Sequence, residues 1–385
     1  MRVVVVAAHL GFGGAERQTL ELLRQLRGTK WAPVRVICLS TSVDPYGEAV
    51  RELGYPLSII HRRGGFDLGR CLELRRLLQQ DEADVVHAVN WFASGYSVLA
   101  RTRRARIIST IRNSHLPAGI LRRSLLPLLI RRAAGVLVNS ERGRQLLMRT
   151  CKVPPDRITL VPNGIDVDLL RNTAIPGTFR RELHIPADAP VVAYIGRNAR
   201  VKNIPRLLHV ARQVLRMNPD VQIVLAGEGL DPRLVAGSDL ARVPRLHCLG
   251  PRDDIPSVLC DATLLLLTSD SEGLPNVVLE ALGSGVPVVA TAVGDLAHIL
   301  PERCGALVAP DTEQLVSAVQ RVIADAPAYR RAAEQHAAHL RVTHTVQKMA
   351  ARTVDVWRHV GPPVANDLVP HSALHSAISK NQDGG

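Results

Sequence analysis

The sequence of 385 residues is poor in aromatic side chains, which make up only 3% of it. It has no apolar run of the roughly 18 residues that a membrane-spanning helix needs. Its six cysteines lack the paired spacing of a metal site or a disulfide framework, so we expect reduced core residues. No Asp-x-Asp pair stands out as a metal site, and we expect neither a metal nor another cofactor. The N-terminus lacks the long apolar core of a signal peptide, which favours a cytoplasmic protein.

Positive charge is abundant and unevenly distributed. Residues 1–165 hold 26 Lys+Arg and 12 Asp+Glu, a net charge of +14, whereas the remaining 220 residues hold 22 and 23. The excess predicts an anionic partner for the first part of the chain only. A basic nucleic-acid-binding protein is the alternative from another class. Because few aromatic residues are interleaved with the basic ones as stacking platforms, we expect no nucleic-acid partner.

Short apolar runs rich in β-branched residues alternate with helical patterns along most of the chain. This alternation predicts an α/β protein with two doubly wound parallel sheets, that is, two Rossmann-like domains. The predicted strands are Arg2–Ala7, Val34–Leu39, Val85–Ala88, Arg106–Ile111, Gly135–Asn139, Ile158–Pro162, Val191–Ile195, Gln222–Ala226, Leu246–Gly250, Thr263–Leu267 and Val286–Thr291.

The domain boundary is predicted just after the segment Val161–Asp166, which gives a first domain of residues 1–165 and a second of residues 166–345. Residues 167–190 are polar and interrupted by prolines, as in a linker. Residues 361–385 show no periodicity, and we expect a disordered tail. Ligands of doubly wound sheets bind at the carboxyl ends of strands, so the default site is a cleft between two facing domains.

Two predicted strands end in turns suited to an anion. The first is followed by His9–Glu16, in which Gly13 and Gly14 allow close approach of backbone N–H groups, although a plain tight turn is equally compatible. The strand Val191–Ile195 is followed by Arg197 and by Lys202, one of only five lysines in the chain. A solvated loop is the alternative for this second turn.

Residues 271–291 read SEGLPNVVLEALGSGVPVVAT and place two acids, Glu272 and Glu280, around the start of an apolar helix. Asn276, Glu280 and Ser284 fall at i, i+4 and i+8, one narrow polar stripe. A solvent-exposed face is the alternative. A single acid on an otherwise apolar helix favours contact with a ligand, and two carboxylates can accept hydrogen bonds from the hydroxyls of a polyol.

In this combination the chain resembles glycosyltransferase family 4, the retaining nucleotide-sugar transferases of the GT-B fold, of the type that builds bacterial envelope glycans and exopolysaccharides. The resemblance extends over about residues 1–358 and implies two domains facing across a cleft, with a final helix at 346–360 crossing back onto the first. It is carried by the motifs Gly13-Gly14-Ala15-Glu16, Val161–Asp166, Gly196-Arg197…Lys202, Leu249–Asp253 and Glu272-x7-Glu280.

The resemblance also implies roles for individual residues. Glu280 would hold the ribose of the donor, and Arg197 and Lys202 its diphosphate. The implied donor site is completed by Gly13, Gly14, Arg252 beside the base, and Glu272, Gly273, Leu274, Pro275 and Asn276 around the transferred sugar. The implied catalytic residues are His87, Arg197, Lys202 and Glu272.

Two strand ends in the first domain carry further candidates. His87 ends a strand, where a satisfied core histidine is the alternative, but the family commonly has a histidine here. After Arg106–Ile111 many members carry a second histidine, whereas this chain has Arg112 and Asn113. Arg112 could bind an anionic sugar or the phosphate of an acceptor, with Glu16 also on the acceptor side.

The resemblance implies a retaining transfer of a sugar from a nucleoside-diphosphate sugar, and we expect a lipid-linked or envelope-glycan acceptor. A nucleotide-sugar epimerase of the same fold is the alternative. Residues 101–132 set leucines between arginines, which predicts peripheral docking of the first domain on the anionic inner face of the cell membrane, although a core helix with solvated ends fits the same pattern. The arginines concerned are Arg101, Arg103, Arg104, Arg106, Arg122, Arg123, Arg131 and Arg132.

Overall fold

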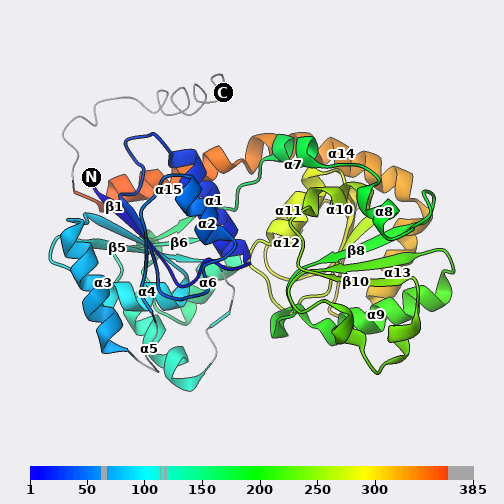
Figure 1. The fold of residues 1–385 in the computed structure, drawn as a ribbon, viewed down its shortest axis with the longest axis horizontal. Coiled ribbons are helices and arrows are strands. Elements are labelled where there is room, and N and C mark those ends of the chain that lie inside the picture. The colour runs from blue at the N-terminus through cyan, green and yellow to red at the C-terminus, as the bar shows by residue number, and fades with distance from the viewer. Residues whose placement is uncertain (62–66, 113–114, 117–118, 363–385) are drawn as a thin grey trace. The chain divides into compact units, whose positions relative to one another are not determined.

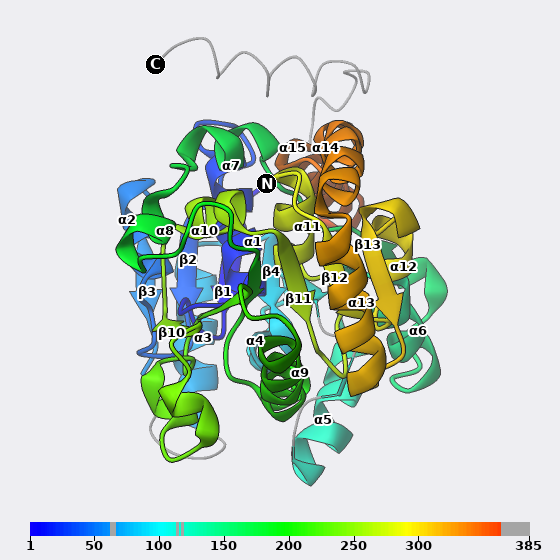
Figure 2. The same cartoon turned by 90° about the vertical axis from the view of Figure 1, so that its right-hand side faces the viewer.

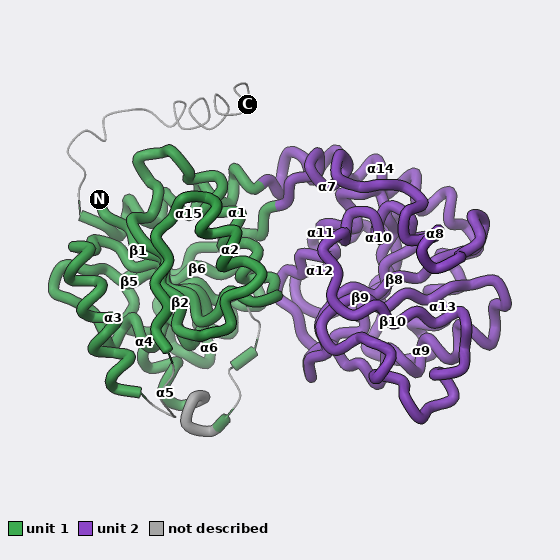
Figure 3. The backbone as a smooth tube through the Cα atoms, in the orientation of Figure 1, with its two compact units in different colours: residues 1–164, 346–385 green, residues 165–345 purple. Residues whose placement is uncertain are grey.

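A computed structural model of the protein describes residues 1–61, 67–112, 115–116 and 119–362 (Figure 1). Asn113 and nearly all of the expected disordered tail lie outside these residues, as do the side chains of residues 120–123. The chain divides into two compact units, shown in two colours in Figure 3. Unit 1 comprises residues 1–164 and the residues from Val346 onward, and unit 2 comprises residues 165–345.

Unit 1 is built on a seven-stranded parallel sheet with the strand order β3-β2-β1-β4-β5-β6-β7. Its central strands are apolar along their whole length because helices cover both faces, as in a doubly wound sheet. The strands are β1 (Val3–Ala7), β2 (Arg35–Cys38), β3 (Leu57–Ile59), β4 (Val85–Val89), β5 (Arg106–Ile111), β6 (Gly135–Val138) and β7 (Ile158–Leu160).

The helices of unit 1 bury alternate strand residues on the two faces of this sheet. Helices α3 and α4 pack on the face of Val4 and Val86, and α1 and α15 pack on the face of Val3 and Val85. The helices are α1 (Gly14–Leu26), α2 (Tyr46–Glu52), α3 (Leu68–Gln80), α4 (Asn90–Leu99), α5 (Ile120–Ile130), α6 (Glu141–Arg149) and α15 (Val346–Val360).

Helix α15 belongs to unit 1 although it ends the described chain. It packs against α1, β5 and β6, and its Trp357 is fully buried in the core of that unit. The Trp357 Nε1–H donates a hydrogen bond of 2.9 Å to Nδ1 of His87 on β4. The last helix is therefore anchored to the centre of the sheet by both packing and a buried polar contact.

Unit 2 has a six-stranded parallel sheet with the order β10-β9-β8-β11-β12-β13. Helices α9 and α13, which lie side by side in Figure 2, cover one face, and α10, α11 and α14 cover the other. The strands are β8 (Val191–Ile195), β9 (Gln222–Ala226), β10 (Leu246–Gly250), β11 (Leu264–Leu267), β12 (Val288–Thr291) and β13 (Gly305–Val308). The helices are α7 (Val167–Thr173), α8 (Thr178–Glu182), α9 (Ile204–Met217), α10 (Ile255–Asp261), α11 (Asn276–Gly283), α12 (Leu296–Ile299), α13 (Thr312–Ala324) and α14 (Ala326–Thr343).

The prediction of two Rossmann-like parallel sheets is confirmed, and each predicted strand is present with its ends shifted by two residues at most. The interpretation of residues 167–190 as a linker is wrong. This segment forms α7 and α8, and its Val167, Leu170 and Phe179 are buried in unit 2. The prolines lie in the short connections beside these helices, and Gly177 is the N-cap residue of α8. Within the described residues, no helix is both long and apolar enough to cross a membrane.

The substitution Trp357→Phe tests the anchoring of α15. Phenylalanine keeps an aromatic ring but removes the N–H donor, which leaves the buried Nδ1 of His87 unpaired. An unpaired buried acceptor costs about 1–3 kcal/mol, so the midpoint of urea unfolding should fall. The control Arg352→Gln changes an exposed residue of the same helix and should leave the midpoint in place. Equal midpoints for the Phe variant and the wild type would contradict this anchoring.

Candidate functional site

Three strands of unit 2 end in glycine or run directly into it, and their backbones approach one another closely. Gly196 follows β8 and donates its N–H to Ala226 O at 2.9 Å, and Gly227 donates to Gly250 O at 2.7 Å. Gly227 has a φ of +141°, and a Cβ at that position would lie 1.9 Å from Gly196 O. Only glycine fits there, so this carboxyl edge presents bare backbone.

The turn after β8 is tied to the loop after β11. The backbone N–H of Asp270 donates to Val201 O at 2.8 Å, and the hydroxyl of Thr268 donates to Lys202 O at 3.1 Å. Arg206 at the start of α9 adds hydrogen bonds to Thr268 O at 2.9 Å and to the Asp270 carboxylate at 2.7 Å. These contacts fix where the side chains of both segments point.

As a result, two residues predicted for the donor site meet. Lys202 Nζ lies 2.7 Å from Oε1 of Glu272, and the Ser269 hydroxyl donates to the same oxygen at 2.6 Å. Arg197, directly after Gly196, is exposed, and no residue in the described part of the chain forms a hydrogen bond or ion pair with it. This edge therefore holds the Lys202 ammonium paired with the Glu272 carboxylate, and the Arg197 guanidinium, which has no partner among the described residues.

Glu280 lies on α11, where every residue from Val277 to Gly283 is buried. Its side chain is only 4% exposed, which rules out the alternative of a solvent-exposed face. The loop before α11 is held by the turn after β12: Asp295 N–H donates to Gly273 O at 3.1 Å. Gly294 has a φ of +64°, and a Cβ there would lie 2.5 Å from Gly273 O, so this contact also requires glycine.

Arg252, which is expected beside the base, forms ion pairs within unit 2. Its guanidinium donates to the Asp254 carboxylate at 2.6 and 2.8 Å and to the Glu182 carboxylate at 2.9 Å. These two carboxylates raise the pKa of Arg252 above its ordinary value. Arg252 therefore joins the end of α8 to the start of α10, and most of its N–H groups are already engaged in unit 2.

His87 in unit 1 is buried and has a partner on each ring nitrogen. Nδ1 accepts from Trp357, so the proton resides on Nε2, which contacts the Thr110 hydroxyl at 2.9 Å. Burial, with a smaller contribution from the charge of Arg112, lowers the pKa of His87 to about 3. In this geometry neither nitrogen is left for a substrate, which favours a positioning role over the predicted catalytic one.

The remaining candidates of unit 1 form a buried polar cluster at the carboxyl edge of its sheet. Glu16 folds back over Gly13, where a Cβ would lie 2.1 Å from Glu16 Oε2, and its other oxygen is 3.3 Å from His9 Nε2. Arg112 donates to the side-chain oxygen of Asn163. Burial lowers the pKa of Arg112 to about 10, so the guanidinium stays charged at neutral pH.

The structure thus brings the predicted residues together in two groups, one in each unit. Lys202 and Glu272 meet at one edge of unit 2, and Glu16, His87 and Arg112 lie near the carboxyl edge of unit 1. Sequence reasoning missed several supporting residues, of which Gly227 had a signal, because it directly follows a predicted strand. The others are Ser269, Gly294 and Trp357.

Comparison with known proteins agrees with this arrangement. Residues 12–169 match the family described as Glycosyltransferase Family 4, and residues 189–325 match the family described as Glycosyl transferases group 1. The first match lies in unit 1 apart from residues 165–169, and the second lies entirely in unit 2. The chain therefore belongs to the family-4 glycosyltransferases, as the motif resemblance predicted.

Among its relatives is the D-inositol 3-phosphate glycosyltransferase of Mycolicibacterium smegmatis, which is 30% identical over 295 residues. The match covers 70% of this chain and 66% of that protein, so the chain matches slightly less than two thirds of the relative's length. The structure of Anabaena HepE in complex with UDP-glucose is similar with a TM-score of 0.77 and 18% identity, over 93% of this chain and all of that one. Sucrose-phosphate synthase of Thermosynechococcus elongatus has a TM-score of 0.72 and 20% identity, over 94% and 99% of the two chains. These likenesses confirm the predicted GT-B fold.

The pKa of His87 leads to a prediction about acid stability. Between pH 6.5 and about 3 the unfolded chain binds a proton on His87 and the folded chain does not, so stability is lost as the pH falls through this range. The loss should approach about 1.4 kcal/mol per pH unit. Urea unfolding of the wild type and of His87→Gln, from neutral pH down to about pH 5, should show a shallower slope for the variant. Parallel slopes would contradict the burial of a neutral His87.

Proposed function

We propose that this protein is a retaining glycosyltransferase that binds a nucleoside-diphosphate sugar at the carboxyl edge of the unit 2 sheet. The observation that carries the proposal is the cluster of Lys202, Glu272 and Arg197 beside the glycine-built strand ends. The two cations suit a diphosphate, and the carboxylate suits sugar hydroxyls. The complex of HepE with UDP-glucose, a protein of the same fold, supports this class of donor.

The proposed chemistry follows from where charge develops. Breaking the bond between the anomeric carbon and the donor phosphate oxygen leaves negative charge on the nucleoside diphosphate. Arg197 and Lys202 stabilise that charge, and Glu272 orients the sugar through its hydroxyls. Glu280, which is buried on α11, holds the ribose of the donor. The reaction needs no metal in this scheme, and retention of configuration is proposed from the family.

For the acceptor we propose an envelope glycan or a lipid-linked sugar reached at an anionic membrane surface. Two leucines on one side of α5, Leu125 and Leu128, are 47% and 53% exposed, and Arg131 and Arg132 at its end are exposed as well. Exposed leucines beside arginines suit a lipid surface. Arg104 contributes less to binding an anionic membrane than expected, because its charge is paired with Asp84. A small phosphorylated acceptor, as in the names of the relatives, is the second candidate, and the half-buried Arg112 favours it.

The donor site is tested by thermal shift with uridine, guanosine and adenosine diphosphate sugars, followed by variants with the donor that binds. Arg197→Ala should lower turnover by about a hundredfold, because the charge acts most as the leaving group departs. The melting temperature should stay the same, since Arg197 supports no described contact. Arg242→Ala removes an exposed arginine from elsewhere in unit 2 and should retain full turnover. Full turnover of the Arg197 variant would contradict the assignment of Arg197 to the donor site.

Membrane docking is tested by co-sedimentation with anionic phosphatidylglycerol vesicles at low and high salt. The wild type should bind at low salt, and binding should fall in a variant carrying Leu125→Gln, Leu128→Gln, Arg131→Gln and Arg132→Gln. Each lost basic contact removes about 1 kcal/mol near the surface. The matched control is Leu169→Gln with Ile175→Gln, two exposed apolar residues of unit 2. No sedimentation of the wild type at low salt rejects the docking proposal.

A further inference from the structure

Arg70, in the first turn of α3, is a buried arginine that forms no ion pair with any residue that the structure describes. Its side chain is 2% exposed, yet Nε and Nη2 have no hydrogen-bond partner in the described structure. The guanidinium carbon lies 5.5 Å from the centre of the Phe92 ring and 5.2 Å from that of Tyr96, both on α4. The aromatic faces compensate part of the cost of burying this charge but accept no directed hydrogen bond as a carboxylate does.

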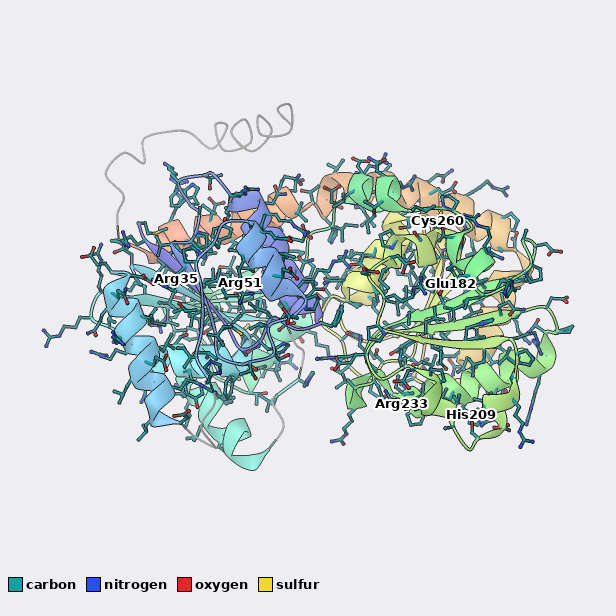
Figure 4. The ribbon with its side chains drawn as sticks, viewed as in Figure 1. Arg35, Arg51, Glu182, His209, Arg233 and Cys260 are labelled. Atoms are coloured by element: carbon teal, nitrogen blue, oxygen red, sulfur yellow. The ribbon has the colours of Figure 1, made fainter. Side chains whose placement is uncertain are left out.

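The two unpartnered atoms are those with which other arginines of this chain bind an oxyanion. Nε and Nη2 form one edge of the planar guanidinium and match two oxygens of a carboxylate or phosphate. This edge is filled by an aspartate carboxylate in four other cases, two of which, Arg35 and Arg233, are labelled in Figure 4. The four pairs are Arg35 with Asp81, Arg212 with Asp239, Arg233 with Asp231 and Arg252 with Asp254.

The acid that caps the same helix does not fill the edge. Asp67 caps α3, and its carboxylate accepts a hydrogen bond of 3.1 Å from the backbone N–H of Arg70 instead of from the guanidinium. Tyr96 is held in place because its hydroxyl accepts from the Asp67 N–H at 3.2 Å. The capping carboxylate and the two rings therefore orient Arg70 without supplying the two oxygens that its free edge matches.

The position of Arg70 suits a substrate. Helices α3 and α4 follow β3 and β4, so the first turns of both lie at the carboxyl edge of the unit 1 sheet, where ligands of such sheets bind. Glu16 and Arg112 belong to the same edge. Burial raises the pKa of the Cys38 thiol at the end of β2, and the positive charge of Arg70 offsets part of this rise.

We propose that Arg70 is a recognition residue for an oxyanion, a phosphate or carboxylate group carried by the acceptor, which it binds through Nε and Nη2. As an acceptor subsite it rests on the proposed function, but oxyanion binding by unit 1 can be measured without transfer. An unpaired buried charge is a cost that the ligand-free protein carries and that the bound oxyanion removes.

The test measures thermal stabilisation by inorganic phosphate, glucuronate and, as a neutral control, glucose. All proteins carry Arg197→Ala and Lys202→Ala, so that phosphate cannot act through the donor site. Phosphate or glucuronate should stabilise this double-variant background. It should equally stabilise the control, in which Arg76→Met replaces an exposed arginine of the same helix. Arg70→Met should abolish the effect, and Arg70→Lys should weaken binding roughly tenfold because it keeps the charge but loses the paired N–H groups. The more effective of the two oxyanions identifies the acceptor group.

The melting temperature without ligand separates recognition from a structural role. If Arg70 serves a ligand, replacing its unpaired charge by methionine leaves the melting temperature equal or higher, whereas a structural arginine would lower it. The proposal is overturned if neither oxyanion stabilises the background, or if Arg70→Met responds as Arg76→Met does. If Arg70→Met fails to fold, the affinity of Arg70→Lys for the oxyanion decides whether Arg70 binds it. Nucleotide binding by the Arg70 variants with an intact donor site shows whether the proposed function stands independently.

Discussion

The chemistry of unit 2 depends on the hydrogen bonds that join the turn after β8 to the loop after β11. Lys202 and Glu272 are 70 positions apart, yet their charged atoms are 2.7 Å apart. Backbone groups make much of the connection, through Asp270 N–H to Val201 O and Thr268 to Lys202 O. Because these contacts form without a ligand, they position the cation and the carboxylate in advance for the donor that we propose. Pre-organised charge of this kind is what stabilises a leaving diphosphate most effectively.

Pairing distinguishes the arginines that hold the fold from those that can bind a ligand. Arg252 and Arg104 satisfy carboxylates and thereby join segments within their units. Arg197 and Arg70 lack such partners in the described structure, the first exposed at a strand end and the second buried between two rings. In a chain this rich in arginine, the number of positive charges therefore says little about function, and the absence of a partner says more.

Much of the fold could be predicted from the sequence because buried parallel strands are apolar along their length. The strands β3 and β13 escaped prediction: β3 has only three residues, all half-buried, and β13 starts with a glycine. Lys202 and Glu272 could be identified as candidates because they follow strands closely, and Glu280 because it is the single acid on an otherwise apolar helix. The partners of the candidate residues could not be predicted, because they are distant in sequence. Arg252 binds Glu182 across 70 positions, and His87 binds Trp357 across 270. Sequence patterns indicate which residues reach the carboxyl edge, whereas long-range packing decides which of them are already engaged.

Hydrogen–deuterium exchange with and without the nucleoside diphosphate that binds tightest tests most directly whether the donor site lies in unit 2. The account predicts slower exchange in residues 196–203, 227–231 and 269–277, the segments that surround Lys202 and Glu272 at one edge of the sheet. Exchange in the last turns of α13 should stay the same, because this helix follows β13 and runs away from the carboxyl edge of the sheet. Protection confined to unit 1, or protection nowhere despite saturating nucleotide, would contradict the account.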